Sequence, residues 1–269
     1  MKLCIVIPSW SYERFRSAVG SFLARAIEPE RLSFVFVGPA SEEEGIRDLI
    51  GRPAGVIEVL TKMRVGPIDA MNRGGVRALD TGAEIIGFIH DDVEMIEVGW
   101  DERISLVFQH TPRCGLLGFG GATGLADEDI YRTPYRLIQL ARHDYRSNMR
   151  DWQIHGKRAE VPMRVAVLDA FSQIFTRDAY TAMGTWKAAL DLGLYHHMID
   201  AFAACMMRRL GYEVWLAPIH AHHSGGITST SALYDSDLRA KGIAGDSEIH
   251  ERAHKLIFEH FRDVLPIRV

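Results

Sequence analysis

The chain has 269 residues, a formal net charge of −4 and a pI of about 6.3. A chain of this length can bury a full hydrophobic core, and its slightly acidic balance offers no basic surface of the kind that attracts nucleic acids or anionic membranes. No apolar run reaches the roughly 20 residues of a membrane-spanning helix, and no signal peptide is visible. We therefore expect one cytoplasmic domain with no nucleic-acid partner and no transmembrane segment.

The chain has three cysteines, Cys4, Cys114 and Cys205, and all three lie in apolar contexts without CxxC spacing. Such a sparse, odd set argues against a disulfide framework and against a zinc knot. We expect buried free thiols, which are usual in a reducing cytoplasm.

The first 90 residues alternate between short apolar runs and amphipathic segments. The apolar runs predict strands over residues 3–9, 32–38, 56–60 and 84–90. Helical spacing or helix-start signals between them predict helices over residues 12–26, 41–50 and 66–79. This alternation predicts a parallel sheet with helices on both faces.

Three of these predicted strands end in segments that should lie together. They are Pro8–Ser9–Trp10, Gly38–Pro39 and His90–Asp91–Asp92. Ligands of open α/β sheets bind outside the carboxyl ends of the strands, so these segments should line one crevice.

The second half of the chain is less regular. Residues 114–124 predict a strand that runs into a flexible glycine loop, and residues 164–180 predict two strands with a turn at Asp169. A helix is predicted over residues 196–211, a strand over 212–218 and an amphipathic helix over 247–261. The aromatic and basic segment 131–152 fits an acceptor loop, a dimer surface or a solvated loop.

The stretch "GFIHDDVEM" brings carboxylates together after a wholly apolar strand. Asp91 and Asp92 are adjacent and Glu94 follows, so something positive is needed to relieve their repulsion. One explanation is a solvated turn, in which Asp is common. The other is a cation, because hard oxygen ligands suit Mg²⁺ or Mn²⁺.

A second group, "HAHHSGG", contains His220, His222 and His223 directly after another apolar strand. These histidines are either surface residues or metal ligands. If the strand continues, His220 and His222 share one face and His223 points the other way.

A third candidate is Asp200 on the predicted helix 196–211. His196 and His197 precede it by four and three residues, which places all three on one helical face. The carboxylate is either an exposed side chain or a general base.

The stretch "MNRGG" places Gly74 and Gly75 inside a predicted helix. Each glycine costs about 1 kcal/mol relative to alanine there. Close approach of the helix to a ligand or a neighbouring strand explains the pair, and tight packing alone is the alternative.

Six segments, in the same order along roughly residues 1–225, resemble motifs of GT-A glycosyltransferases of the large family 2 type. "LCIVIPSW" resembles "VSVVIPTYN", "GPIDAMNRGGVRA" resembles the "arNrGi..A" helix, and "GFIHDDVEM" resembles the metal-binding "fLDDDve" region. "VLDAFSQIFTRDAYTAMG" resembles the acceptor-side "gacmlirRe.f..vG". "HHMIDAFAACMMRRLGYEVWLAP" resembles "eDvDlclRlrraGyrvwyvP", and "HHSGG" resembles "HhgG".

The resemblance implies a single GT-A domain, Rossmann-like, with a mixed, mainly parallel sheet. Residues 1–112 would form the half that binds the nucleotide-sugar donor, and residues 113–269 the acceptor-side half with the C-terminal helix. Asp92 would ligate the metal, with His223 as a further ligand and His222 as its alternative. Asp200 would be the general base. The implied nucleotide-sugar contacts are Pro8, Ser9, Trp10, Gly38, Arg73, His90 and Asp91.

The chain departs from the family pattern at several positions. Gly38 and Pro39 follow Val37 where an aspartate usually reads the nucleobase, so the base is left open. His90 replaces the first aspartate of the DxD motif and removes a charge. Ile199 and Phe202 replace the other acids of "eDvD", so the base assignment depends on Asp200 alone.

The function implied is transfer of a hexosyl group from a nucleotide-diphosphate sugar to an acceptor hydroxyl of unknown identity. Mn²⁺ or Mg²⁺ would be the cofactor, and Asp200 would make the reaction inverting. A retaining mechanism remains open because the fold hosts both outcomes. The alternatives are a metallohydrolase and a catalytically degenerate sugar-nucleotide-binding protein. Homo-oligomers are also left open.

Overall fold

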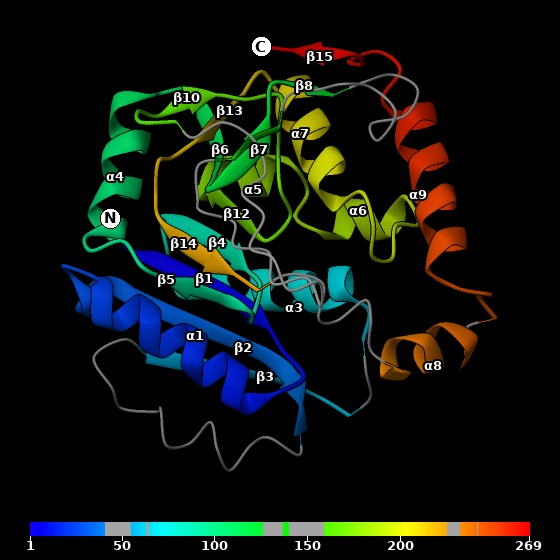
Figure 1. The fold of residues 1–269 in the computed structure, drawn as a ribbon, viewed down its shortest axis with the longest axis horizontal. Helices are drawn as coiled ribbons and strands as arrows, with labels where there is room; N and C mark the ends of the chain where they lie inside the picture. The colour runs from blue at the N-terminus through cyan, green and yellow to red at the C-terminus, as the bar shows by residue number, and fades with distance from the viewer. Residues whose placement is uncertain (41–54, 63–64, 126–136, 140–158, 225–231, 241) are drawn as a thin grey trace.

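The structure, a computed structural model, describes residues 1–40, 55–62, 65–125, 137–139, 159–224, 232–240 and 242–269. Its centre is an eight-stranded mixed sheet in the order β10-β13-β6-β12-β4-β1-β2-β3 (Figure 1). Strands β3, β2, β1 and β4 pair in parallel, as do β6 and β13, whereas β12 and β10 run antiparallel to their neighbours. The strands are β1 Leu3–Pro8, β2 Leu32–Pro39, β3 Gly55–Thr61, β4 Ile85–Ile89, β6 Cys114–Gly118, β10 Met163–Arg164, β12 Ser172–Thr176 and β13 Glu213–Leu216.

Helices cover both faces of this sheet, as the alternation predicts. On β1, Leu3, Ile5 and Ile7 face one apolar cluster, and Cys4 and Val6 face the other. The first cluster is closed by α1 (Tyr12–Arg25) and α4 (Trp100–His110). The second is closed by α3 (Pro67–Asp80), α5 (Arg177–Ala182), α6 (Lys187–Asp191), α7 (Ile199–Arg209) and α9 (Asp246–His260).

Smaller elements complete the fold. Strand β5 (Val93–Met95) pairs with β14 (Ala221–His223), and β8 (Gly124–Leu125) pairs with β15 (Ile267–Arg268). Strand β7 (Gly120–Ala122) lies between β9 (Leu137–Gln139) and β11 (Val167–Leu168). A 3-10 turn, η1 (Pro29–Arg31), precedes β2, and α8 (Ala232–Ala240) precedes α9. No helix of the described ranges has the length and apolar character needed to cross a membrane.

The predicted strands and helices of the first 90 residues are confirmed within two residues at each end, apart from 41–50, which lies outside the described residues. Most of the aromatic and basic segment 131–152 also lies outside them. The strand over 212–218 and the C-terminal helix are confirmed as β13 and α9. All three cysteines are free and buried, also as predicted.

Two predictions for the second half are wrong in detail, and a third is confirmed. The expected flexible glycine loop is strand β7, because Gly121 lets Val167 and Leu168 of β11 approach closely. The strand, turn and second strand predicted within 164–180 are confirmed as β11, the turn that follows Asp169, and β12; after Thr176, whose hydroxyl accepts a hydrogen bond from the Ala179 amide, the chain forms α5. Helix α7 starts at Ile199 and not at residue 196, because Met198 adopts a left-handed conformation with φ of 63°.

Gly74 and Gly75 are explained by packing of α3 against its neighbours. A Cβ at Gly74 would lie 2.3 Å from Val6 Cγ1, and one at Gly75 would lie 2.1 Å from the Tyr180 hydroxyl. Side chains at these positions would push α3 away from β1 and α5. Gly74 therefore allows close approach of α3 to a strand, and Gly75 allows close packing against Tyr180 of α5.

Gly74→Ala should destabilise the protein by roughly 1–3 kcal/mol, because the added methyl group meets a stiff, fully buried valine. Gly20→Ala in α1 is the matched control, since a Cβ there has no heavy atom within 4 Å, and it should stabilise by up to about 1 kcal/mol. Urea unfolding of both variants measures the difference. Equal stabilisation by the two substitutions would show that α3 can move away from the sheet at little cost.

Candidate functional site

The turn after β4 is held against the second half of the chain by strand pairing. Residues 90–92 leave the buried strand β4 and enter β5, and β5 pairs with β14 so that Val93 lies opposite His223. The Ser224 amide donates a hydrogen bond to the Asp92 carbonyl, at 3.1 Å, and extends this pairing. Two segments about 130 residues apart are thereby brought to the carboxyl end of the parallel strands.

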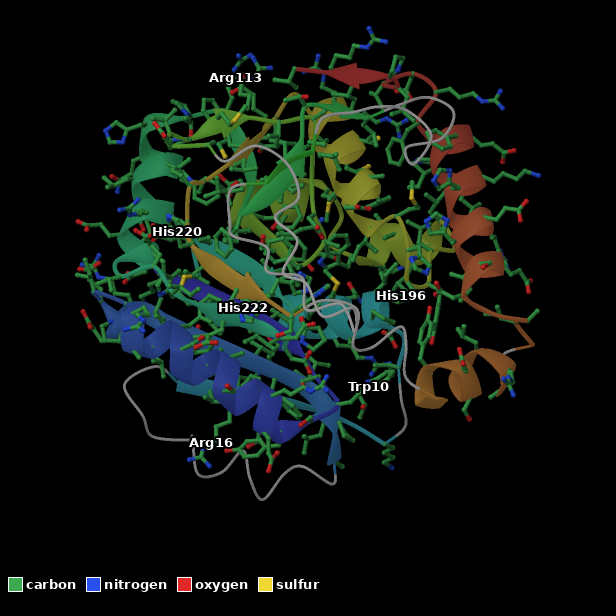
Figure 2. The ribbon with its side chains drawn as sticks, viewed as in Figure 1. Trp10, Arg16, Arg113, His196, His220 and His222 are labelled. Atoms are coloured by element: carbon green, nitrogen blue, oxygen red, sulfur yellow. The ribbon has the colours of Figure 1, made fainter. Side chains whose placement is uncertain are left out.

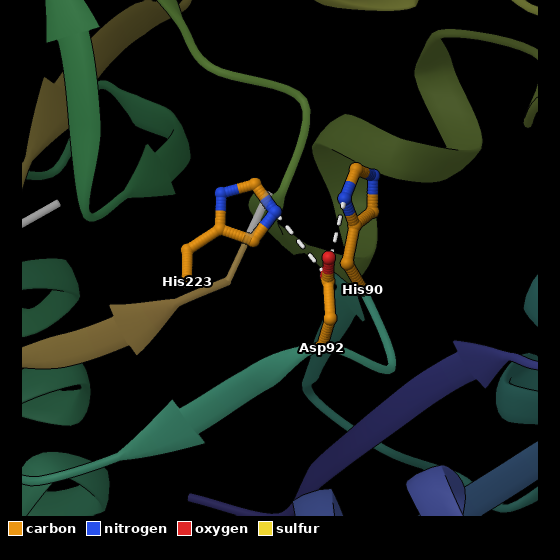
Figure 3. A group of neighbouring side chains, drawn as sticks. All are labelled: His90, Asp92 and His223. Atoms are coloured by element: carbon orange, nitrogen blue, oxygen red, sulfur yellow. Dashed lines mark ion pairs between the residues drawn. The ribbon is translucent and has the colours of Figure 1, made fainter. Parts of the chain in front are cut away.

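His90, Asp92 and His223 form one compact group there, and Figure 3 shows their polar atoms converging. Asp92 Oδ1 lies 3.2 Å from His223 Nε2 and 3.9 Å from His90 Nδ1. One ligand atom from each residue lies within 4.8 Å of the other two. The Phe171 ring stacks on the His223 ring at 4.7 Å and fixes its plane.

The charges in this group depend on one another. Burial works against the Asp92 carboxylate, but His223 and His90 beside it hold its pKa below the ordinary value. Burial, together with the neighbouring His223, lowers the pKa of His90, and Asp92 and Asp169 only partly oppose this. A pKa below the ordinary value favours the neutral His90 imidazole at pH 7, which has a lone pair for a metal.

The residues present fit a divalent cation. Asp92 Oδ1 is buried, and within the described ranges no donor is aligned to hydrogen-bond to it, although two imidazoles lie close by. A cation would satisfy this oxygen. One carboxylate and two imidazoles suit Mn²⁺ and later transition metals better than Mg²⁺, which prefers an all-oxygen shell.

The ends of β1, β2 and β4 form one edge, as predicted. Ser9, at the end of β1, donates to Val37 of β2 through its amide, and its hydroxyl donates to Asp91 Oδ2 at 2.6 Å. Burial raises the pKa of Asp91, and the Ser9 hydroxyl opposes that effect. A Cβ at Gly38 would lie 2.4 Å from the Ser9 carbonyl oxygen, so only glycine fits there.

The other predicted nucleotide contacts take different positions. Pro8 ends β1 and Trp10 follows Ser9, and both side chains are partly exposed at this edge. Arg73 lies on α3, half exposed, and its Nε donates to Asp69 Oδ1 at 3.0 Å. None of the described contacts joins Arg73 to the group of His90, Asp92 and His223.

The histidines of β14 separate as strand alternation predicts. His223 is 6% exposed and faces Asp92, whereas His222 faces the other side, with Nδ1 3.9 Å from Glu94 Oε2. His220 precedes the strand, and its Nε2 lies 3.9 Å from Glu97 Oε2; both His220 and His222 are labelled in Figure 2. The structure therefore brings His223 to the candidate metal group and does not bring His222.

Asp200 is the second residue of α7, and its partly buried carboxylate accepts a hydrogen bond from the Ala201 amide at 2.8 Å. Burial raises its pKa to about 6, and this outweighs the Ala201 amide, which favours the ionised form. His197 and His196 precede the helix, so the expected shared helical face does not exist. A carboxylate with this pKa is mostly ionised at pH 7 and is a stronger base than an ordinary aspartate.

Asp200→Asn should stabilise the fold at pH 8 and change little at pH 4. The folded pKa of about 6 exceeds the ordinary 3.8, so stability present below pH 3.8 is lost as pH rises through 6. The difference between the two pKa values corresponds to about 2–3 kcal/mol of folding free energy. A protein with an uncharged asparagine at this position would not lose that stability as the pH rises. Thermal unfolding at both pH values checks this. Asp191→Asn, at an exposed site on α6, is the control for the loss of a carboxylate.

Asp169 is a site residue that its sequence context marks only as a turn. Its charge acts on both His90 and Asp200, so it lies near the candidate metal group and near the candidate base. Its backbone amide donates to the Gly120 carbonyl, so β7 and the turn before β12 hold it there. The strands β7 and β11 are far apart in the sequence, so no local motif predicts their pairing.

The chain matches no protein-family model and no curated protein sequence. Solved structures do match its fold. The mannosyltransferase PcManGT from Pyrobaculum calidifontis, in complex with GDP-Man and Mn²⁺, aligns over 96% of this chain and 70% of its own, with a TM-score of 0.55 and 13% identity. S. aureus TarS 1–349 in complex with UDP-GlcNAc aligns over 97% of this chain and 72% of its own, with a TM-score of 0.52 and 13% identity.

The fold is that of GT-A glycosyltransferases. The similarity covers nearly the whole chain, and the mixed sheet with helices on both faces agrees with it. The predicted GT-A fold is thereby confirmed. At 13% identity the similarity establishes the fold alone, so the roles of individual residues must be argued from their geometry.

Proposed function

We propose that this protein is a metal-dependent glycosyltransferase that moves a hexosyl group from a nucleotide-diphosphate sugar to an acceptor hydroxyl. The observation that carries the proposal is the convergence of His90, Asp92 and His223 at the carboxyl end of the parallel strands of a GT-A fold. The two similar structures contain GDP-Man with Mn²⁺ and UDP-GlcNAc, respectively, which supports a nucleotide-sugar donor here. The buried free cysteines support a reducing, cytoplasmic setting.

In this proposal, Asp92 and His223 would hold the cation, and His90 would be a third ligand. When bound, the cation neutralises charge on the leaving diphosphate. The hydrogen bond from Ser9 to Asp91 would hold the ends of β1 and β4 together beside the nucleotide. Gly38 lets the end of β2 approach the Ser9 backbone closely there. The neutral His90 reduces the negative charge of the group compared with an aspartate at that position.

Asp200 is the proposed general base. Its carboxylate would accept the proton of the acceptor hydroxyl while that oxygen attacks the anomeric carbon from the side opposite the leaving diphosphate. The new bond then has the inverted configuration. Burial raises the pKa of Asp200, and the like charge of Asp169 nearby adds to this effect, so both strengthen Asp200 as a base.

A donor screen tests the proposal. Nucleotides and nucleotide sugars with Mn²⁺ should raise the melting temperature, because a ligand at 100 times its Kd stabilises a protein by about 2.7 kcal/mol. The best donor should then release its nucleoside diphosphate only when a sugar or another hydroxyl acceptor is added. Release without any acceptor would favour a metallohydrolase, and binding without turnover would favour a degenerate sugar-nucleotide-binding protein.

His223→Ala should weaken Mn²⁺-dependent nucleotide binding by about 10-fold or more, since even outer hydrogen-bond partners of a metal are worth roughly 10–100-fold. His220→Ala and His222→Ala should leave it nearly unchanged, because these side chains lie beside Glu97 and Glu94. Titration calorimetry of UDP and GDP with Mn²⁺ measures the affinities. A larger loss in either control would place the ligand on the other face of β14.

A further inference from the structure

A second cluster of metal-binding side chains lies outside the proposed donor site, where three segments of the second half meet. His196 and His197 come from the turn before α7, Asp246 is the first residue of α9, and Tyr234 lies on α8. Figure 2 shows His196 on the side of the molecule that carries α8 and α9. One ligand atom from each of His196, His197 and Asp246 lies within 4.8 Å of the other two.

Contacts between these segments aim the polar groups at a common point. His197 Nε2 lies 2.6 Å from Asp246 Oδ1, and His196 Nδ1 lies 2.5 Å from the Tyr234 hydroxyl. The Tyr234 hydroxyl in turn donates to Asp246 Oδ1 at 2.8 Å. The His250 ring, on α9, lies 4.9 Å from the His197 ring and packs against the cluster.

We propose that His196, His197 and Asp246 bind a second metal ion, a transition-metal cation of the Zn²⁺ or Co²⁺ class. Two imidazoles and one carboxylate are the donor set that such ions prefer, and Mg²⁺ does not share this preference. Three protein ligands would leave a fourth position for water. The proposal depends only on this cluster, and it stands whether or not the donor site binds a metal.

The cluster is accessible to an ion from solvent, because the side chains of His197 and Asp246 are 21% and 43% exposed.

Binding requires a small opening of the cluster. Two ligand atoms, each about 2 Å from a tetrahedral zinc, lie about 3.3 Å apart. The contact between His197 and Asp246 therefore has to lengthen by less than about 1 Å, which a side-chain rotation provides. The bound ion would then tie the start of α9 to the turn that leads into α7, only a few residues before Asp200.

The test is Co²⁺ binding to untagged protein, measured by calorimetry and by the visible absorption of bound Co²⁺. We expect two ions per chain in the wild type, and one fewer in His197→Ala and in Asp246→Asn. His223→Ala should lose the other ion, and a double variant with His197→Ala should bind none. His110→Ala, an exposed histidine on α4, is the control and should keep both.

Asp246→Asn keeps the shape of the side chain, and circular dichroism will show that each variant is folded. If the wild type binds one ion that is lost in His197→Ala and Asp246→Asn but kept in His223→Ala, the proposed second metal site is supported. The proposed metal at the donor site is then contradicted. If neither substitution in the cluster removes an ion or weakens one at least 10-fold, the proposal is overturned. A wild type that binds no Co²⁺ overturns it too.

Discussion

Asp200→Asn should lower kcat by about 10²–10⁴-fold and leave donor affinity nearly unchanged. Asparagine keeps the shape of the side chain and can still accept a hydrogen bond from the Ala201 amide, but it cannot take a proton. The proposed base acts on the acceptor hydroxyl and does not contact the metal or the diphosphate. Steady-state kinetics with saturating acceptor, together with calorimetry of the donor, would separate the two effects.

Two further measurements identify the role of Asp200. In the wild type, kcat should fall as pH drops through about 6, because burial raises the pKa of this carboxylate to that value and only the ionised form is a base. This acidic limb should vanish in Asp200→Asn and persist in Asp191→Asn. Proton NMR should show a product of inverted anomeric configuration. A retained configuration, or near wild-type turnover of Asp200→Asn, would favour the retaining mechanism.

The donor half of the fold follows from local sequence signals. Each strand from β1 to β4 is a short apolar run, and Ser11 and Pro67 mark the starts of α1 and α3. Helix α4 was not predicted, because Gly99 begins it in a left-handed conformation and no side chain caps it. Long-range pairing decides the second half, where β7, β10, β11, β14 and β15 have only two or three residues each and little periodicity to detect.

In the candidate site, too, local sequence signals identify some residues, and only long-range contacts reveal the others. Asp92 and His223 could be singled out because each follows an apolar strand, and the pairing of β5 with β14 then brings them within 3.2 Å. Strand alternation favoured His223 over His222 once that pairing was known. Asp246 could not be predicted to join His197, because they are 49 positions apart, helices α7 and α8 lie between them in the chain, and no spacing rule connects them.

Asp92→Ala should abolish the metal dependence of nucleotide binding. In the wild type, UDP or GDP should bind much more tightly with Mn²⁺ than with EDTA, because the cation links the diphosphate to the Asp92 carboxylate. Removing Asp92 leaves only imidazoles to hold the ion, so the difference should shrink by roughly 10–100-fold or more. Titration calorimetry with Mn²⁺, Mg²⁺ and EDTA measures it, and the two imidazoles should make Mn²⁺ the better of the two metals.

Glu94→Ala is the matched control for this prediction. Glu94 lies two residues beyond Asp92 on β5, but 66% of its side chain is exposed and it lies beside His222, on the opposite face of the strand from His223. Glu94→Ala removes the same charge as Asp92→Ala at a position only two residues away. A general electrostatic effect would therefore weaken nucleotide binding in both variants. If only Asp92→Ala loses the difference between Mn²⁺ and EDTA, the carboxylate acts as a ligand. Equal wild-type affinities with Mn²⁺ and with EDTA would contradict a metal-dependent donor site altogether.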